Sequence, residues 1–179
     1  MSNPLLWPYD DLIHAYWVEP RSILAGEYPG NADPMKARTK IELLCDNGIR
    51  TFIDLTQPAD GLTPYDSTLD AVGLSRGVDL VRIPHPIPDM GVLPTNQYDD
   101  ILESVHRSAD NGGVYIHCWG GIGRTATVVG CLFVEMGLSG EGAMRTIKER
   151  RADTRKANMR APQTHQQRDV IFQRAAKRP

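Results

Sequence analysis

Short runs of apolar residues alternate with longer stretches of helical periodicity along this chain. The short runs predict buried strands at residues 17–18, 23–25, 49–55, 78–83 and 113–116. The longer stretches predict helices at residues 34–47, 64–74, 94–110 and 125–134, then one that Ser139 caps, and one that opens at residues 161–168 with Pro162 in its first turn. Strands that alternate with helices are typical of an α/β fold, so we expect a central, mainly parallel sheet flanked by helices.

Residues 1–30 have a composition of their own, rich in proline, glycine and aromatic side chains. Within them, a turn at residues 19–22 separates two apolar runs and predicts a strand, a turn and a strand. With 179 residues, of which 41% are hydrophobic and 23% charged, the chain can fill one core but has little room for a second domain. We therefore expect one domain over residues 1–179, with an opening segment and hairpin at 1–30 and an α/β core at 31–179.

The overall charge bears on possible binding partners, and the cysteine content bears on disulfide bonds. The formal net charge is −2, so charge alone does not favour a nucleic acid or an anionic membrane, and no apolar stretch approaches the length of a membrane span. Three cysteines, Cys45, Cys118 and Cys131, are too few and too scattered for a disulfide framework. We expect a monomeric, cytoplasmic protein with no nucleic-acid or membrane partner.

The stretch with the most specific chemistry is residues 117–125, HCWGGIGRT, between a predicted strand and a predicted helix. The first turn of a helix has N–H groups without intrahelical partners and a partial positive charge. Glycines let the backbone aim those groups at one anion such as phosphate, and the planar guanidinium of Arg124 can bind two phosphate oxygens at once. Beside such positive charge the pKa of a thiol falls to roughly 3.5 to 7.5, so we expect Cys118 to be largely thiolate at neutral pH.

This Cys-x5-Arg-Thr pattern resembles the signature of the cysteine-dependent protein tyrosine phosphatases, and its HCxxGxGRT form is most similar to the small dual-specificity members. The resemblance implies a protein tyrosine phosphatase-like α/β fold and hydrolysis of phosphate monoesters through a phosphocysteine, with no metal or other cofactor. Cys118 would be the nucleophile, Thr125 would donate a hydrogen bond to its thiolate and His117 would order the loop. The phosphate would be bound by Trp119, Gly120, Gly121, Ile122, Gly123 and Arg124.

Three other interpretations of this stretch are weaker. An ordinary buried cysteine would not explain the glycines and the arginine beside it. A Walker-type nucleotide loop would carry a Lys-Ser or Lys-Thr pair after its glycines, and none follows here. Zinc binding by His117 and Cys118 would need a second pair of ligands such as Cys-x2-Cys, which the sequence lacks.

The proline-rich residues 84–91 follow the predicted strand at 78–83 and suit neither a helix nor an inner strand. If the neighbouring strands are parallel, this loop lies at the same sheet edge as Cys118. The departing oxygen of a phosphate ester needs a proton, and in the resembled family an aspartate in such a loop supplies it, which implies that Asp89 is the general acid. His85 is the competing proton donor, and a solvated loop aspartate is the alternative without a function.

The start of the last predicted helix resembles the family's Gln-Thr-x-x-Gln element, whose first glutamine orients water against the phosphocysteine. That resemblance implies that Gln163 orients the water and that Gln167 holds the second glutamine position. Small dual-specificity members often have Ser-Pro-Glu-Thr there instead, so an ordinary helix-capping role of Gln163 is the alternative.

Three further features allow two interpretations each. Glu27 could bind a distant arginine and brace the site, or it could be a surface turn residue. Cys45 could pair with Cys118 as a redox guard, or it could simply face the core. Seven basic side chains in residues 145–160 could draw an anionic substrate toward the site, although a solvated helix face and loop is the favoured interpretation.

Together these features favour a protein phosphatase that acts on phosphotyrosine, with phosphoserine and phosphothreonine as further candidates. Residues 119–121 carry no lysine, whereas relatives that act on inositol phospholipids commonly do, so the expected substrate and partner is a phosphorylated protein or peptide. Hydrolysis of inositol polyphosphates or other small phosphate monoesters is one alternative. A phosphopeptide-binding module without turnover is the other.

Overall fold

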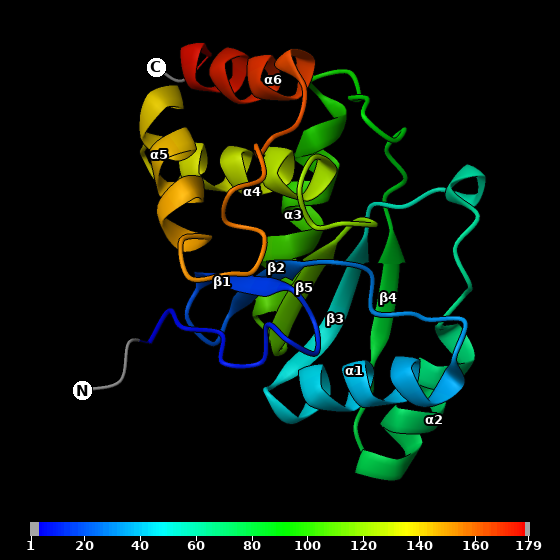
Figure 1. Cartoon of the computed structure of the whole chain (residues 1–179). Coiled ribbons are helices and arrows are strands. Elements are labelled where there is room, and N and C mark those ends of the chain that lie inside the picture. Colours follow the sequence, from blue (N-terminus) through cyan, green and yellow to red (C-terminus); the bar gives the residue numbers. More distant parts are fainter. Residues whose placement is uncertain (1–3, 178–179) are drawn as a thin grey trace.

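Five strands form one sheet in the computed structural model, which describes residues 4–177 (Figure 1). In chain order they are β1 (Ala15–Glu19), β2 (Ile23–Gly26), β3 (Ile49–Asp54), β4 (Val81–Pro84) and β5 (Gly113–His117). Their spatial order is β1-β2-β5-β3-β4, and every neighbouring pair except β1 and β2 is parallel. The expected mainly parallel sheet is therefore confirmed, and the antiparallel pair is the predicted hairpin.

Helices cover both faces of this sheet. They are α1 (Pro34–Asp46), α2 (Asp66–Arg76), α3 (Gln97–Ala109), α4 (Arg124–Glu135), α5 (Gly140–Arg150) and α6 (His165–Ala176), with a short 3₁₀ helix, η1 (Pro58–Asp60), after β3. One side carries α1 and α2, and the other carries the remaining four, with α4 packed between α5, α6 and the sheet (Figure 1). None of the helices within residues 4–177 combines the length and the hydrophobicity that crossing a membrane requires.

The central strands are apolar on both faces because each face has a core layer. In β5, Val114 and Ile116 pack with the layer under α4, whereas Tyr115 packs with the layer under α1 and α2. The alternation is the same in β3, where Phe52 and Ile53 point to opposite layers. Parallel strands buried on both sides read as continuous apolar runs, and this explains why residues 49–55 and 113–116 were recognisable from the sequence.

Helix α1 begins and ends where its sequence indicates. The Asp33 carboxylate accepts a hydrogen bond from the Met35 N–H at 2.9 Å, and Pro34 occupies the first turn, where its missing N–H costs nothing. Gly48 follows the helix with a φ of 91°, a conformation that favours glycine. The side chains predicted to face inward are buried: Ile41, Leu44 and Cys45.

The strand predicted over residues 78–83 is shorter than expected, because the end of α2 uses its first residues. Gly77 adopts a φ of 65°, and the Val78 N–H donates to the Gly73 carbonyl at 3.0 Å. This hydrogen bond satisfies a carbonyl of the last helical turn, as in a Schellman motif. The chain therefore joins the sheet only at Val81.

The start of the last helix is also different from the prediction. Pro162 does not lie in its first turn, because the N-cap is Thr164, whose hydroxyl accepts from the Gln167 N–H at 3.2 Å. The Gln167 side chain in turn accepts from the Thr164 N–H, which completes a capping box. The sequence contains this Thr-x-x-Gln cap, and it is a stronger start signal than the proline.

The register of the sheet places three loops at one edge. Asp54, the last residue of β3, pairs with Pro84 at the end of β4 and with His117 at the end of β5. The carboxyl ends of these parallel strands are therefore level. The loops that follow them, at residues 55–61, 85–91 and 118–123, all begin at this edge, where ligand sites of open α/β sheets form.

The contact between α4 and α6 yields a first prediction. A Cβ at Gly130 would lie 2.2 Å from Ile171 Cδ1 and 2.7 Å from Ile171 Cγ1, so the two helices approach closely there. We expect Gly130→Ala to lower the free energy of unfolding by about 1–2 kcal/mol, because overpacking outweighs the roughly 1 kcal/mol that alanine gains in helix propensity. Urea denaturation measures the change. Adding Ile171→Val should recover part of the loss, and a more stable Gly130→Ala protein would contradict this packing.

Candidate active site

The glycine-rich loop at residues 118–123 connects β5 to α4 and meets the loops that follow β3 and β4. Cys118 is only 3% exposed and packs at the edge of the core layer under α4. Arg124, the first residue of α4, is 2% exposed, although its side chain is long and charged. Both reactive groups predicted from the sequence are therefore buried.

The buried guanidinium of Arg124 is held from two sides. Its Nη1 donates to Asp60 Oδ2 at 2.6 Å, to the Ile87 carbonyl at 3.1 Å and to the Leu55 carbonyl at 3.5 Å. Its Nη2 lies 3.2 Å from Asp89 Oδ1 and has no hydrogen-bond partner among residues 4–177. This nitrogen therefore has an ion-pair partner but no hydrogen bond within the described residues, which is unusual for a buried donor.

The two carboxylates beside Arg124 differ in their surroundings. Asp89 lies on the proline-rich loop with a side chain that is 51% exposed, whereas the side chain of Asp60 is 3% exposed. Asp60 Oδ2 also accepts from the Gln57 N–H at 3.2 Å, so it is fixed by its own turn. Sequence analysis missed Asp60. It belongs to the loop after β3, and the strand-end rule that selected Asp89 applies to it equally.

Two hydrogen bonds orient the peptide planes of the glycine loop. The Trp119 carbonyl accepts from the Tyr28 N–H at 2.9 Å, and the Gly120 carbonyl accepts from Lys156 Nζ at 2.9 Å. In a trans peptide the N–H points opposite to the carbonyl, so the N–H groups of Gly120 and Gly121 point away from these outer supports. Gly121 has a φ of 72°, and a Cβ there would lie 2.5 Å from the Gly26 carbonyl carbon, so only glycine fits.

Glu27 joins this support to the basic stretch at residues 145–160. The Arg155 guanidinium donates to both Glu27 oxygens at 2.8 and 2.9 Å, and Lys156 Nζ donates to Oε2 at 2.8 Å. Burial alone would raise the pKa of Glu27, but Lys156, Lys40 and Arg155 outweigh it and hold that pKa below its usual value. Glu27 is therefore not a simple surface turn residue, since it binds a distant arginine.

Arg151 shapes the loop that carries these cations. Its side chain is 3% exposed and donates to the carbonyls of Met159 and Lys156 at 3.0 and 2.7 Å. The basic stretch is thus not only a solvated helix face, because part of it forms a structured loop that ends on the glycine loop.

His117 lies beneath the loop with both ring nitrogens engaged. Its Nε2 is 2.8 Å from the Tyr65 hydroxyl, and its Nδ1 is 3.4 Å from the Cys118 carbonyl and 3.8 Å from Asp54 Oδ1. Burial lowers the pKa of His117 to about 4, although the Asp54 carboxylate opposes the shift. The ring is therefore neutral at pH 7, and its neighbours assign the proton to Nδ1, with Nε2 accepting from Tyr65.

Both glutamines of the α6 start lie against the loop. A Cβ at Gly123 would lie 2.5 Å from Gln163 Oε1 and 2.9 Å from Gln167 Nε2. Gln167 is fully buried, accepts from the Gln163 N–H at 3.0 Å and donates to the Gly91 carbonyl at 3.3 Å. It therefore ties α6 to the loop that carries Asp89, a bracing role that sequence analysis did not foresee.

The remaining candidates separate into those inside the site and those outside it. Thr125 is fully buried next to Arg124, and its hydroxyl has no hydrogen-bond partner among the described residues. Ile122 is also buried, whereas Trp119 is 55% exposed at the rim. His85 lies outside, because its Nε2 is 2.9 Å from the Ser104 hydroxyl of α3. Asp89, and not His85, therefore faces Arg124.

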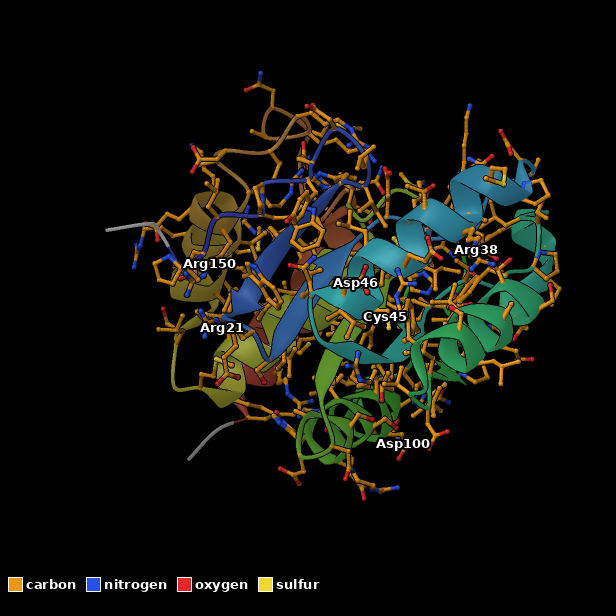
Figure 2. The ribbon with its side chains drawn as sticks, turned by 90° about the horizontal axis from the view of Figure 1, so that it is seen from below. Arg21, Arg38, Cys45, Asp46, Asp100 and Arg150 are labelled. Carbon is orange, nitrogen blue, oxygen red and sulfur yellow. The ribbon has the colours of Figure 1, made fainter. Side chains whose placement is uncertain are left out.

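Cys45 cannot guard Cys118 by forming a disulfide with it. Its carbonyl accepts from Arg50 Nη1 at 2.9 Å near the start of β3, whereas Cys118 follows His117, which pairs with Asp54 at the other end of that strand. Four strand residues span about 13 Å, far beyond the reach of a disulfide. Figure 2 shows Cys45 at the end of α1, and it packs in the layer under that helix, on the other face of the sheet from Cys118.

A cysteine at a strand-to-helix turn, a glycine loop with oriented N–H groups and a buried arginine are the features expected of a phosphatase domain of the cysteine-dependent, dual-specificity type. The chain belongs to the PTP-SAK family, described as the Swiss Army Knife protein, DSP-PTPase phosphatase domain, whose model matches residues 14–175. The resemblance drawn from the signature is thereby confirmed. In the described part of the chain, no group of three or more His, Cys, Asp or Glu side chains is arranged to hold a metal ion.

Individual relatives agree with this assignment. Cyclin-dependent kinase inhibitor 3 from Sus scrofa is 32% identical over 36% of this chain, and the match spans 38% of that relative's own length. The structure of Tk-PTP in the active form is similar with a TM-score of 0.70 and 23% identity, over 97% of this chain and 100% of that one. A kinase associated phosphatase with serine in place of its catalytic-site cysteine has a TM-score of 0.65 and 19% identity, over 93% and 98% of the two chains. At these identities the structural likeness shows the shared fold.

Lys156 offers a test of the outer support of the loop. We expect Lys156→Met to weaken the binding of inorganic phosphate about tenfold, because the Gly120–Gly121 peptide loses the charged donor that orients its N–H. Calorimetric titration with phosphate measures this. Lys156→Arg should retain part of the affinity, and Lys148→Met, an exposed lysine of the same basic stretch, serves as the control. Equal phosphate affinity in Lys156→Met and Lys148→Met would show that the lysine does not orient the peptide.

Proposed function

We propose that this protein hydrolyses phosphorylated proteins or peptides through a phosphocysteine intermediate, with phosphotyrosine as the favoured substrate. The observation that carries the proposal is the Arg124 guanidinium, buried beside the loop that begins with Cys118, whose Nη2 is ion-paired with Asp89 at 3.2 Å and makes no hydrogen bond among residues 4–177. A buried cation with a donor that makes no hydrogen bond, next to a thiol and oriented N–H groups, suits an anion that is to be attacked by sulfur. In a purely structural arginine we expect the donors to be hydrogen-bonded.

In the first step the Cys118 sulfur attacks phosphorus, and the bond from phosphorus to the substrate oxygen breaks. Arg124 and the N–H groups of residues 119–123 bind the equatorial oxygens, on which charge accumulates in the transition state. Asp89 donates a proton to the departing oxygen. Because Asp89 lies 3.2 Å from Arg124 Nη2, it is within reach of a phosphate held by the same guanidinium.

In the second step water attacks the phosphocysteine, the phosphorus–sulfur bond breaks and phosphate is released. Asp89 takes the proton of that water, and Gln163, which lies over Gly123, orients it. Thr125 supports the proposed departure of the thiolate, since its buried hydroxyl has no other partner in the described structure and can donate to sulfur. His117 acts only through the loop that it orders, because it is neutral and engaged on both nitrogens.

The burial of the nucleophile supports phosphotyrosine over the shorter phosphoresidues. Cys118 is only 3% exposed, whereas Trp119 beside it is 55% exposed, so we take the phosphate to bind below the level of the Trp119 ring. A tyrosine ring holds the phosphate several ångströms farther from the peptide backbone than a serine or threonine side chain does. Inositol polyphosphates remain the second candidate for this site. The proposal also takes the protein to act as a monomer in the reducing cytoplasm, and its three cysteines are free in the described residues.

Replacing the nucleophile tests the reaction directly. We expect Cys118→Ser to lose all measurable hydrolysis of p-nitrophenyl phosphate and of a phosphotyrosine peptide, since a serine hydroxyl is not ionised at neutral pH, yet to retain peptide binding. Phosphate release and calorimetry measure the two properties. Normal hydrolysis by the serine variant would refute the phosphocysteine. Wild-type protein that binds the peptide but releases no phosphate would identify a phosphopeptide-binding module.

The two carboxylates beside Arg124 should give different kinetic losses. We expect Asp89→Asn to lower kcat by about 10² to 10⁴ for alkyl phosphates, and less for aryl phosphates, whose oxygens need less protonation. Asp60→Asn should instead weaken the hold on Arg124 and affect both ester types alike, mainly through KM. If Asp60→Asn showed the ester-dependent loss, Asp60 would be the acid and the assignment of Asp89 would fail.

A further inference from the structure

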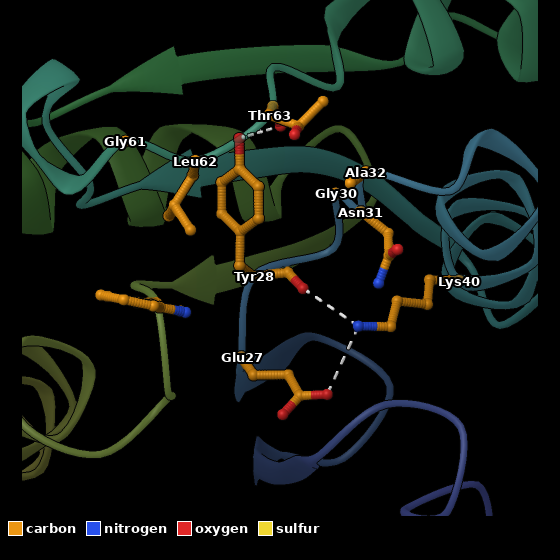
Figure 3. Close-up of a pocket in the computed structure, with 10 residues that line it drawn as sticks. Glu27, Tyr28, Gly30, Asn31, Ala32, Lys40, Gly61, Leu62 and Thr63 are labelled. Atoms are coloured by element: carbon orange, nitrogen blue, oxygen red, sulfur yellow. Dashed lines mark hydrogen bonds and ion pairs between the residues drawn. The ribbon is translucent and has the colours of Figure 1, made fainter.

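A cavity opens beside the glycine loop, with a volume of about 390 Å³. Figure 3 shows the charged, polar and apolar side chains of Glu27, Tyr28, Asn31, Lys40 and Leu62 around it, and Trp119 also lines it. None of the residues proposed to carry out the chemistry lines it, except Trp119 at its edge. The cavity therefore needs an explanation of its own.

Chain neighbours of the reactive residues place this cavity close to the phosphate. Trp119 is the residue after Cys118, and Gly61 follows Asp60, whose carboxylate binds Arg124; both Trp119 and Gly61 line the cavity. Consecutive Cα atoms are about 3.8 Å apart. A peptide whose phosphorylated residue enters the site would thus bring a side chain one or two residues away over this cavity.

Lys40 is the cation that the cavity presents. Glu27 receives its short hydrogen bonds from Arg155 and Lys156, at 2.8 to 2.9 Å, so its charge is already compensated. The ammonium of Lys40 lies farther off, at 3.5 Å from Glu27 Oε1 and 3.4 Å from the Tyr28 carbonyl. Three cations share one carboxylate here, and Lys40 is the one with the weakest contacts.

Asn31 adds a second donor to the same cavity. Its side-chain oxygen accepts from the Asp33 N–H at 2.9 Å, which leaves the amide nitrogen without a hydrogen-bond partner among residues 4–177. In Figure 3 that nitrogen points into the cavity on the same side as the Lys40 ammonium. Leu62 and the half-exposed Trp119 also line the cavity. An ammonium and an amide beside apolar side chains suit a short anionic side chain with an aliphatic stem.

From this arrangement we infer that the cavity is a specificity subsite for an anionic side chain, a carboxylate or a second phosphate, within two residues of the phosphorylated residue of a peptide substrate. The inference rests on the proposed function and narrows its substrate class to acidic phosphopeptides. Lys40 and Asn31 bind the anion, and Trp119 covers the aliphatic part of its side chain. The subsite shares Trp119 with the phosphate-binding loop but is lined by neither Cys118 nor Arg124, so it acts on which peptides are chosen.

A peptide scan tests the subsite. The substrates are phosphotyrosine peptides with neutral flanks, into which one glutamate is introduced at each position from two before to two after the phosphotyrosine. We expect kcat/KM of the wild type to rise about tenfold for glutamate at one or two of these positions, as for a charge-assisted hydrogen bond, and little elsewhere. Phosphoserine at the preferred position, in place of glutamate, should raise kcat/KM at least as much.

Substitutions at Lys40 identify the cation responsible. Lys40→Met should reduce the ratio of kcat/KM between the best glutamate peptide and the neutral peptide to near one, and Lys40→Glu should invert it in favour of a lysine peptide. Lys36→Met, an exposed lysine on the same helix, should keep the wild-type ratio. An unchanged ratio in Lys40→Met, or an equal gain at every peptide position, would overturn the subsite, because a diffuse field has no preferred position.

A binding experiment with the same peptides separates this inference from the proposed function. Cys118→Ser protein is titrated with the same peptides, and the ratio of dissociation constants is measured with and without Lys40→Met. If no peptide is hydrolysed by the wild type but the Lys40-dependent ratio persists in binding, the proposed function fails and the subsite stands. If peptides are hydrolysed without that ratio, the subsite fails and the proposed function stands.

Discussion

One buried positive charge organises this molecule. The Arg124 guanidinium is almost completely removed from water, and such a charge is tolerated only where opposite charges and hydrogen-bond acceptors surround it. Its partners come from separate loops: Asp60 and the Leu55 carbonyl follow β3, and Asp89 and the Ile87 carbonyl follow β4. The hydrogen bonds and ion pairs of this one side chain therefore hold the loops after β3, β4 and β5 together.

The same charge explains why the glycine loop needs support from outside. A loop whose N–H groups converge on one point is disfavoured until an anion arrives, since those dipoles repel one another and repel the nearby guanidinium. The Tyr28 N–H donates to the Trp119 carbonyl, and Lys156 Nζ donates to the Gly120 carbonyl. Lys156 is held in turn by its hydrogen bond to Glu27. A basic residue outside the loop, Lys156, thus orients the loop backbone by hydrogen bonding. Residues 119–121 themselves contain no lysine.

Sequence reasoning recovered what is encoded locally. The strand β5, the glycine turn and the start of α4 are contiguous, and their apolar pattern, glycines and arginine all lie within residues 113–134, so their arrangement could be read directly. Asp89 was selected by the strand-end rule together with a family resemblance that pointed to an aspartate in its loop. The cap at Thr164 was overlooked although it is local, because Pro162 was given more weight than the Thr-x-x-Gln pattern.

The parts that the sequence concealed are contacts between distant residues. Asp60 lies 64 positions from Arg124, Lys156 lies 36 from Gly120, and Gln167 lies 76 from Gly91. Hydrophobic periodicity reports which face of an element is buried, and it carries no information on which polar side chains meet across the fold. Asp60 reads as an ordinary loop acid until the sheet brings Arg124 close. Lys156 and Gln167 stand out in the sequence, as parts of a basic stretch and of a Gln-Thr-x-x-Gln element, but neither pattern indicates Gly120 or Gly91 as the partner.

The glycine loop and the proposed subsite have several contacts in common. Trp119 lines the proposed subsite with its ring, while its carbonyl accepts the Tyr28 N–H that orients the Gly120 peptide; Tyr28 lines the same cavity. Lys40 in turn contacts the Tyr28 carbonyl and Glu27, so it belongs to the network that holds Lys156. If an anion bound Lys40, the Lys40–Glu27 ion pair would weaken, and Glu27 would keep its hydrogen bonds to Arg155 and Lys156. The proposed subsite thus shares its supports with the phosphate-binding peptides, namely the hydrogen bond from the Tyr28 N–H to the Trp119 carbonyl and the one from Lys156 Nζ to the Gly120 carbonyl.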